Sequence, residues 1–208
     1  MPTLQTLLVF VSACLALAIV PGPAVVYIVA RSASQGVRAG LVSVLGIAAG
    51  TIVHIAAAIV GLSALLQASA VAFELVKLAG AGYLIYIGIQ KFRERGASET
   101  AAESMQGLRK TFADAMIVNV LNPKTALFFL AFLPQFVDLT RGSAPQQILV
   151  LGLIMMLVYS TSDTMYALAG ARLLHGFTSR RFRYANEVVG SIYIGLGITA
   201  LVAGRSRS

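Results

Sequence analysis

The sequence is poor in charged residues and almost free of cysteine. Only 12% of its 208 residues are charged, whereas a soluble domain carries about a quarter. So few charges cannot cover a water-facing surface in a chain that is 58% hydrophobic. This composition excludes an ordinary soluble domain, and the dominance of apolar runs excludes a disordered chain. The single cysteine, Cys14, excludes a disulfide scaffold.

The signatures of catalysis, metal binding and nucleotide use are also missing. His54 and His175 with one cysteine make no metal cluster, and no Ser-His-Asp or paired-carboxylate spacing is present. The sequence has no Gly-x-x-x-x-Gly-Lys-[Ser/Thr] loop, so the chain itself should not use ATP. We therefore expect no enzymatic activity, no catalytic residue, no metal and no cofactor.

The basic residues sit mainly in short segments between long apolar runs. A formal net charge of +8 would ordinarily suggest a nucleic-acid partner. The distribution favours membrane orientation instead, because lysine and arginine gather in the loops of membrane proteins. We expect contact with membrane lipid and no nucleic-acid partner.

Six apolar runs are long enough to cross a bilayer, which needs about 20 residues per helix. They lie at about residues 4–30, 40–66, 70–91, 112–137, 146–171 and 185–203. The longest connection, about 92–111, is polar. The fold class expected is an all-α membrane protein with six transmembrane helices, forming a single transmembrane domain over residues 1–208.

Lysine and arginine are unevenly divided between the two sides of this six-span arrangement. One side carries eleven and the other three, and cytoplasmic loops hold the excess. The bias places the 92–111 loop in the cytoplasm and both termini outside. The two sets are Arg31, Arg38, Lys91, Arg93, Arg95, Arg109, Lys110, Arg172, Arg180, Arg181 and Arg183, against Arg141, Arg205 and Arg207.

The segment Val11-Ser12-Ala13-Cys14 resembles a bacterial lipoprotein cleavage box. A signal peptide places basic residues before its apolar run. Here no lysine or arginine precedes Arg31, and the apolar run continues past Cys14. We expect no cleavage at this segment and a small, buried, inert Cys14.

The two halves of the chain share features at matching positions. Pro21-Gly22-Pro23 in the first span is matched by Asn122-Pro123-Lys124 in the fourth. The pattern Lys77-x-x-Gly80-x-x-Tyr83 recurs as Glu187-x-x-Gly190-x-x-Tyr193. These matches indicate two three-span repeats, about 4–91 and 112–203. Because three is odd, the second repeat must be inverted, which is the plan of many secondary transporters with sites at the repeat interface.

Prolines interrupt the first and fourth spans near their centres. Proline removes a backbone donor and clashes with the carbonyl four residues earlier. Freed carbonyls at membrane depth must be buried in protein or line a wet cavity. The sequence therefore predicts a substrate site at Pro21, Gly22, Pro23, Asn122 and Pro123; the alternative is a pair of packing kinks.

Lys124 directly follows the second break. A lysine in mid-span costs about 3 kcal/mol on insertion scales and indicates a function. Lys124 could hold a substrate carboxylate, or it could bond carbonyls freed by a break. Asn119 and Asn122, which are three residues apart on one face, could bind substrate or cap the broken half-helices.

Asp163 lies inside the fifth span in the most polar stretch of any span. Tyr159, Ser160 and Tyr166 are its neighbours at helical spacing. A carboxylate there suits a proton carrier or a partner for a substrate ammonium. The alternative is a static hydrogen-bonded or salt-bridged group, with Lys124 as the candidate partner.

Gly46, Gly50 and His54 recur every four residues and so share one face of the second span. Small residues at this spacing let helices approach closely, so His54 should point at a neighbouring helix or a cavity. Histidine titrates in a range that suits proton coupling, although a neutral hydrogen-bonded role is the alternative. We predict helix packing at Gly46, Gly50, Gly80 and Gly190. The glycine faces could also serve a homodimer.

These motifs together resemble the LysE/RhtB family of amino-acid exporters. The resemblance covers about residues 15–140. It rests on Pro21-Gly22-Pro23, Gly36-x-x-x-Gly40, Gly46-x-x-x-Gly50-x-x-x-His54, Lys77-Leu-Ala-Gly80-Ala-Gly-Tyr83-Leu-x-Tyr86-x-Gly88, Leu121-Asn122-Pro123-Lys124 and Leu133-Pro134-Gln135-Phe136.

The resemblance implies a six-span exporter of amino acids or close derivatives in the bacterial inner membrane, driven by the proton gradient and without a cofactor. Many members carry an acidic residue where this chain has Thr51, which shifts the expected proton role to Asp163. Alternating access would then carry a zwitterion held by Lys124 and Asp163. The rival readings are export of another small solute, such as a cation or lactone, and a non-transporting accessory subunit.

Overall fold

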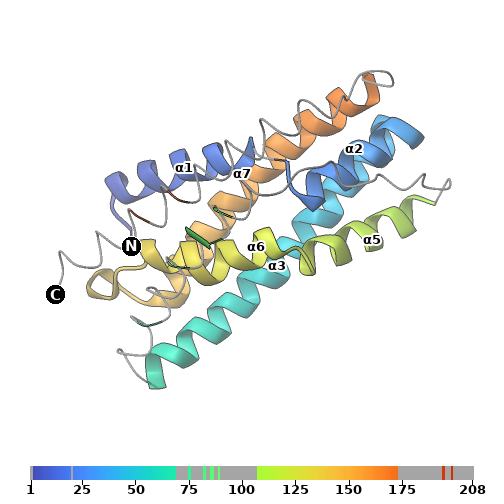
Figure 1. Ribbon diagram of the computed structural model, residues 1–208. Coiled ribbons are helices and arrows are strands. Elements are labelled where there is room, and N and C mark those ends of the chain that lie inside the picture. The colour runs from blue at the N-terminus through green and yellow to red at the C-terminus, as the bar shows by residue number, and fades with distance from the viewer. Residues whose placement is uncertain are drawn as a thin grey trace.

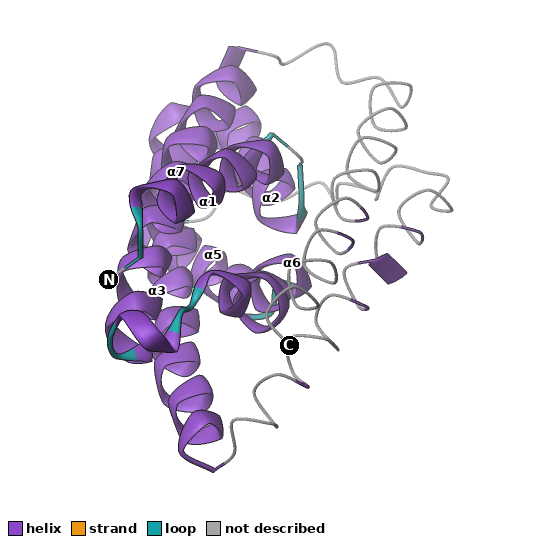
Figure 2. Ribbon diagram, turned by 90° about the vertical axis from the view of Figure 1, so that its left-hand side faces the viewer, coloured by secondary structure: helices purple, strands orange, loops and turns teal. Residues whose placement is uncertain are grey.

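A computed structural model of the protein describes residues 2–19, 21–68 and 107–172, with positions 75, 82, 85, 86, 89, 194 and 198. All regular structure in these residues is helical (Figures 1 and 2), as expected for an all-α membrane protein. Apart from these single positions, the predicted spans 70–91 and 185–203, with Gly80 and Gly190, lie outside the described residues, as does most of the 92–111 loop.

Two helices are continuous and apolar enough to cross a membrane. They are α3 (Val37–Ala68), through its segment Val37–Gly61, and α7 (Ala144–Arg172). They correspond to the predicted spans 40–66 and 146–171. Gly36 separates α3 from the preceding helix at φ +83°, a left-handed conformation that glycine adopts without a steric penalty. The chain reverses direction at this residue.

Two helix pairs are bent where the prolines lie, and each pair taken together is a candidate span, called a broken span below. The first consists of α1 (Leu4–Ala18) and α2 (Pro23–Gln35), bent by 53°, with Pro23 as the first residue of α2. The second consists of α5 (Leu108–Val120) and the segment Pro123–Phe136, which begins with α6 (Pro123–Leu127), and the two are bent by 46°. With each bent pair counted as one span, the described residues contain up to four membrane spans.

The second broken span ends in tighter and wider helical turns. Helix α6 continues as a π-helical turn, η1 (Phe128–Phe132), and a 3-10 turn, η2 (Leu133–Phe136). A further 3-10 turn, η3 (Leu139–Arg141), precedes α7. The π turn is a departure from the regular helix expected over 112–137.

The two broken spans run in opposite directions (Figure 1). The α1–α2 pair runs from left to right, and the α5–α6 pair runs from right to left. Helix α3 packs against both α5 and α7, and α7 also packs against α1 and α2. The turn at Gly36, the start of α5 and the end of α7 therefore share one end of the bundle.

Helices α3 and α5 approach closely at Gly46 and Gly50. A Cβ atom on Gly50 would lie 2.8 Å from both the Asn119 Cβ and the Met116 carbonyl oxygen. A Cβ atom on Gly46 would lie 2.6 Å from the Cβ of Ala115. Real Cβ atoms do not pack so tightly, so this helix pair requires glycine at both positions.

An aromatic cluster fills the core between α1 and the end of the second broken span. The Phe10 ring lies 5.8, 6.1 and 5.0 Å from the rings of Phe128, Phe132 and Phe136. Phe128, Phe129 and Phe132 are buried. These rings are packing residues and not lipid-facing ones. Cys14 lies in the same core and is fully buried.

Arg31 occupies a different place from the one expected. The sequence predicts it in the connection after the first span, but α2 continues to Gln35. Arg31 therefore lies within this helix, where its side chain is buried, with 2% exposure. Its guanidinium lies 5.2 Å from the centroid of the Tyr27 ring. The reason is local: no helix-breaking residue stands between Pro23 and Gly36, so the helix outlasts the apolar run.

Candidate functional site at the helix breaks

The first break leaves a backbone carbonyl that a lysine from the other half of the chain satisfies. Pro21 has no N–H to bond the carbonyl of Leu17, which lies four residues earlier. Lys124 Nζ donates to the Leu17 carbonyl oxygen at 2.8 Å. In this conformation Lys124 therefore makes the second of the two contacts considered from the sequence: it bonds a carbonyl freed by a break.

Gly22 leaves space for the Lys124 side chain. A Cβ atom on Gly22 would lie 3.1 Å from Lys124 Cδ. The backbone of Gly22 is extended, a conformation open to any residue. A side chain at position 22 would therefore be restricted by the space that Lys124 occupies and not by backbone conformation.

Two residues of α7 satisfy the next carbonyls of the same break. Pro23 lacks the N–H that would bond the carbonyl of Ile19. Tyr166 Oη donates to the Ile19 carbonyl oxygen at 2.6 Å, and Ser162 Oγ donates to that of Ala18 at 3.2 Å. The end of α1 is thus held to the second half of the chain by three side-chain donors, Lys124, Ser162 and Tyr166.

The second break also frees a backbone carbonyl that a side chain from elsewhere in the chain satisfies. Pro123 cannot donate to the carbonyl of Asn119, four residues earlier. That carbonyl oxygen accepts from His54 Nε2 at 3.0 Å and from the Asn122 backbone N–H at 3.0 Å. Since the acceptor is a carbonyl, Nε2 is assigned the proton. His54 also stacks on Phe129, so both its ring face and its Nε2 contact protein groups.

The Asn119 side chain connects three helices and is 1% exposed. Its Nδ2 donates to the Ile47 carbonyl oxygen at 2.7 Å and to Thr51 Oγ1 at 2.9 Å, and its Oδ1 accepts from Thr125 Oγ1 at 2.8 Å. Both amide hydrogens are used, so the side chain serves the framework. Thr51 supplies its hydroxyl to this network.

Asn122 is the N-cap of α6. Its Oδ1 accepts from the Lys124 backbone N–H at 3.0 Å. This bond satisfies one of the donors that the first turn of a helix leaves without an intrahelical partner. The cap fixes the start of α6 and with it the position from which the Lys124 side chain leaves.

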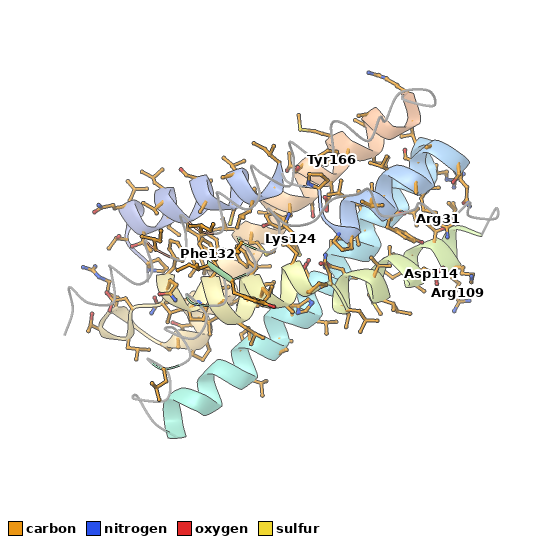
Figure 3. The ribbon with its side chains drawn as sticks, viewed as in Figure 1. Arg31, Arg109, Asp114, Lys124, Phe132 and Tyr166 are labelled. Carbon is orange, nitrogen blue, oxygen red and sulfur yellow. The ribbon has the colours of Figure 1, made fainter. Side chains whose placement is uncertain are left out.

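A small cavity lies between the two breaks, and Figure 3 labels one of the residues that line it, Lys124. Its volume is about 20 Å³, room for one water molecule and not for an amino acid. The wall combines one basic and one acidic side chain with small polar and apolar ones. It is lined by Ala18, Gly22, Ala24, Val25, Ile47, Thr51, Asn119, Asn122, Lys124, Thr125, Tyr159 and Asp163.

Asp163 and Lys124 supply the two charges of this cavity. Asp163 is 6% exposed, and among the described residues none donates a hydrogen bond to its carboxylate. It interacts electrostatically with Lys124. Lys124 Nζ also lies 5.5 Å from the centroid of the Tyr159 ring. The cavity therefore presents an ammonium, an aromatic face and a carboxylate.

The structure brings most of the predicted site residues together and leaves one apart. Gly22, Asn119, Asn122, Lys124 and Asp163 line the cavity, and the three prolines form the breaks beside it. His54 is not a lining residue and lies behind Asn119.

Sequence reasoning missed the roles of Ser162, Tyr166 and Thr125. Ser162 and Tyr166 are four residues apart in an apolar span, a spacing that places both on one face of α7. That spacing could have indicated a pair of donors aimed at one neighbour. Thr125 carried no such signal.

Comparison with known proteins gives a consistent set of matches. A family model described as LysE type translocator matches residues 15–204. An uncharacterized membrane protein of Vibrio cholerae is 35% identical over 189 residues, 88% of this chain and 90% of that protein. No solved structure matches the chain.

Two further relatives have functional names. The homoserine/homoserine lactone efflux protein of Salmonella typhimurium is 33% identical over 186 residues, 87% of this chain and 88% of that protein. The leucine efflux protein of Salmonella choleraesuis is 26% identical over 181 residues, 85% of each chain.

Proposed function

The chain belongs to the LysE family of translocators, and from this premise we propose that it exports amino acids or close derivatives from the cytoplasm. The names of the two efflux relatives support this class of substrate. The observation that carries the proposal is the cavity between the two breaks, whose wall holds one positive and one negative side chain. An amino-acid zwitterion has the same pair of charges.

We propose that the substrate binds by both of its charged groups. Lys124 holds the carboxylate with its ammonium group, since the backbone N–H groups of Asn122 and Lys124 are already bonded within the second break. Asp163 and the carbonyls at Pro21-Gly22-Pro23 hold the ammonium, and Asp163 exchanges the proton that drives export by antiport. Burial in a wall with few donors makes Asp163 the described acid best suited to that exchange.

The transport step in this proposal is alternating access. A cavity of about 20 Å³ cannot hold an amino acid, so the described conformation is a closed one that must open to bind. Phe10, Phe128 and Phe132 form the apolar seal on the side where α1 begins. Movement of the two broken spans at their proline hinges would open either side.

The proposed architecture is six spans in two inverted repeats, about 4–91 and 112–203. The opposite directions of the two broken spans support it (Figure 1). The proposed location is the inner membrane of a bacterium, multi-pass, with both termini outside and the 92–111 loop inside. Arg109 and buried Arg31 lie at the end proposed to face the cytoplasm (Figure 3).

A second candidate substrate is a lactone derivative. The relative named for homoserine and homoserine lactone efflux favours it. A lactone keeps the ammonium but lacks the free carboxylate, so it would depend on Asp163 more than on Lys124. Export of amino acids and lactones by the same cells separates the two candidates.

An export assay in cells tests the proposal. Cells expressing the wild type, Asp163→Asn, Lys124→Ala or Asp114→Asn would be loaded with a panel of amino acids and lactones, and the external solutes measured by mass spectrometry with and without a protonophore. Asp114 is the matched control, because it is a partly exposed acid paired with Lys110 on the surface of α5.

We expect selective, protonophore-sensitive export by the wild type and Asp114→Asn and its loss in Asp163→Asn. Unchanged export by Asp163→Asn would refute the proton role, and unchanged export by Lys124→Ala would refute the carboxylate role. External solutes equal to those of empty cells across the panel would favour another small solute, such as a cation, or an accessory subunit.

A further inference from the structure

The Lys124 ammonium group lies among three groups that recognise any primary ammonium. It donates to the Leu17 carbonyl oxygen at 2.8 Å. It lies 5.5 Å from the centroid of the Tyr159 ring, and the Asp163 carboxylate lines the same cavity. A carbonyl acceptor, an aromatic face and a carboxylate are the groups that bind an amine in a desolvated site.

These groups do not depend on lysine for their placement. The Leu17 carbonyl is freed by Pro21, and the Tyr159 and Asp163 side chains come from α7. If Lys124 withdrew, the carbonyl would remain buried without its donor, which is unfavourable. Another ammonium bound there would restore the hydrogen bond and the charge balance.

The cavity has no room for two ammonium groups at this position. Its volume of about 20 Å³ accommodates one water molecule with Lys124 in place. Lys124 and a substrate ammonium must therefore bind in turn. This exclusion links the position of the Lys124 side chain to whether substrate is bound.

From this geometry we propose that Lys124 is a tethered occupant of the substrate's ammonium subsite. An arriving zwitterion places its own ammonium against Leu17, Tyr159 and Asp163, and the displaced Lys124 ammonium then pairs with the carboxylate of the same molecule. This inference rests on the proposed function for the identity of the substrate.

The exchange makes Lys124 a residue that determines specificity. An amine without a carboxylate would displace Lys124 and leave its charge without a counterpart. A carboxylate without an ammonium would leave Lys124 in the subsite. A molecule that carries both groups satisfies every charge, so the site selects α-amino acids over simple amines and acids.

Binding of methylammonium to the purified protein tests the proposal without any transport. Cys14 is the only cysteine and is fully buried, so a thiol-reactive fluorophore reports thermal unfolding. We expect methylammonium to raise the Tm of Lys124→Ala by about 3–6 °C at roughly ten times its Kd. Tetramethylammonium at equal ionic strength has no N–H to donate and should give no such rise.

The controls test whether methylammonium binds only where Lys124 has left the ammonium subsite. The wild type and Lys110→Ala, which loses an exposed lysine of α5, should show no methylammonium-specific rise. Adding Asp163→Asn to Lys124→Ala should reduce the rise. Gly22→Val provides a second route, because its side chain would collide with the Lys124 stem and vacate the subsite without removing the lysine.

Three results would overturn the proposal. The first is an equal rise in Tm with methylammonium and tetramethylammonium, and the second is a rise in the wild type equal to that in Lys124→Ala. The third is the absence of a methylammonium-specific rise in both Lys124→Ala and Gly22→Val. Because the assay measures binding, its failure is distinguishable from a failure of export.

Discussion

Removal of the Asn119 side chain is expected to lower stability by an amount that can be worked out from its contacts. The side chain makes three buried hydrogen bonds, to Ile47, Thr51 and Thr125. Side-chain hydrogen bonds within membranes average about 0.6 kcal/mol, with a maximum of about 1.7. Asn119→Ala should therefore lower the free energy of unfolding by about 2 kcal/mol, and by up to about 5 if each bond is near that maximum.

Thermal unfolding followed through the Cys14 thiol measures this effect. A loss of about 2 kcal/mol corresponds to a fall in Tm of about 4–8 °C for a chain of this size. Thr125→Val, which removes one of the three bonds, should give about a third of that fall. A Tm of Asn119→Ala within one degree of the wild type would refute the view that this network holds α3, α5 and α6 together.

Three further predictions concern the helix contacts around the breaks. Gly50→Ala should lower the free energy of unfolding by about 1–3 kcal/mol or more, since its new methyl meets backbone as well as Asn119; a wild-type Tm would contradict the packing described. Tyr166→Phe leaves the Ile19 carbonyl without its donor and should lower the Tm and slow export, and unchanged values of both would contradict this role. His54→Gln keeps a donor near the Nε2 position and should retain stability and export, whereas His54→Leu should lose stability; loss of export alone in His54→Gln would instead assign proton transfer to the imidazole.

The sequence was informative about where the helices break and much less about what satisfies the breaks. Pro21, Pro23 and Pro123 are local signals, because proline acts on the carbonyl four residues earlier wherever it stands in a helix. The donors come from far along the chain: Lys124 reaches Leu17 across 107 positions. Such pairings depend on tertiary packing, which a single sequence does not specify.

Two other features illustrate the same limit. The π turn Phe128–Phe132 reads as an ordinary apolar helix in the sequence, since nothing in its composition marks a change of hydrogen-bond register. A charge usually ends an apolar span, and the sequence therefore predicts Arg31 in a connection; in the structure it is buried within α2, against the Tyr27 ring.

The acceptors at the first break are main-chain carbonyls, and this has a consequence for divergence within the family. A carbonyl is present whatever residue occupies positions 17 to 19, so substitutions there leave the hydrogen bonds intact. We therefore expect the break to be weakened by substitution of the three donors, Lys124, Ser162 and Tyr166. The apolar wall residues Val25 and Ile47 make none of these side-chain bonds, so, under the proposed function, we expect a change in their size to alter which substrate side chain fits. We expect that the same helix framework could accept different substrates while the same hydrogen bonds hold its two halves together.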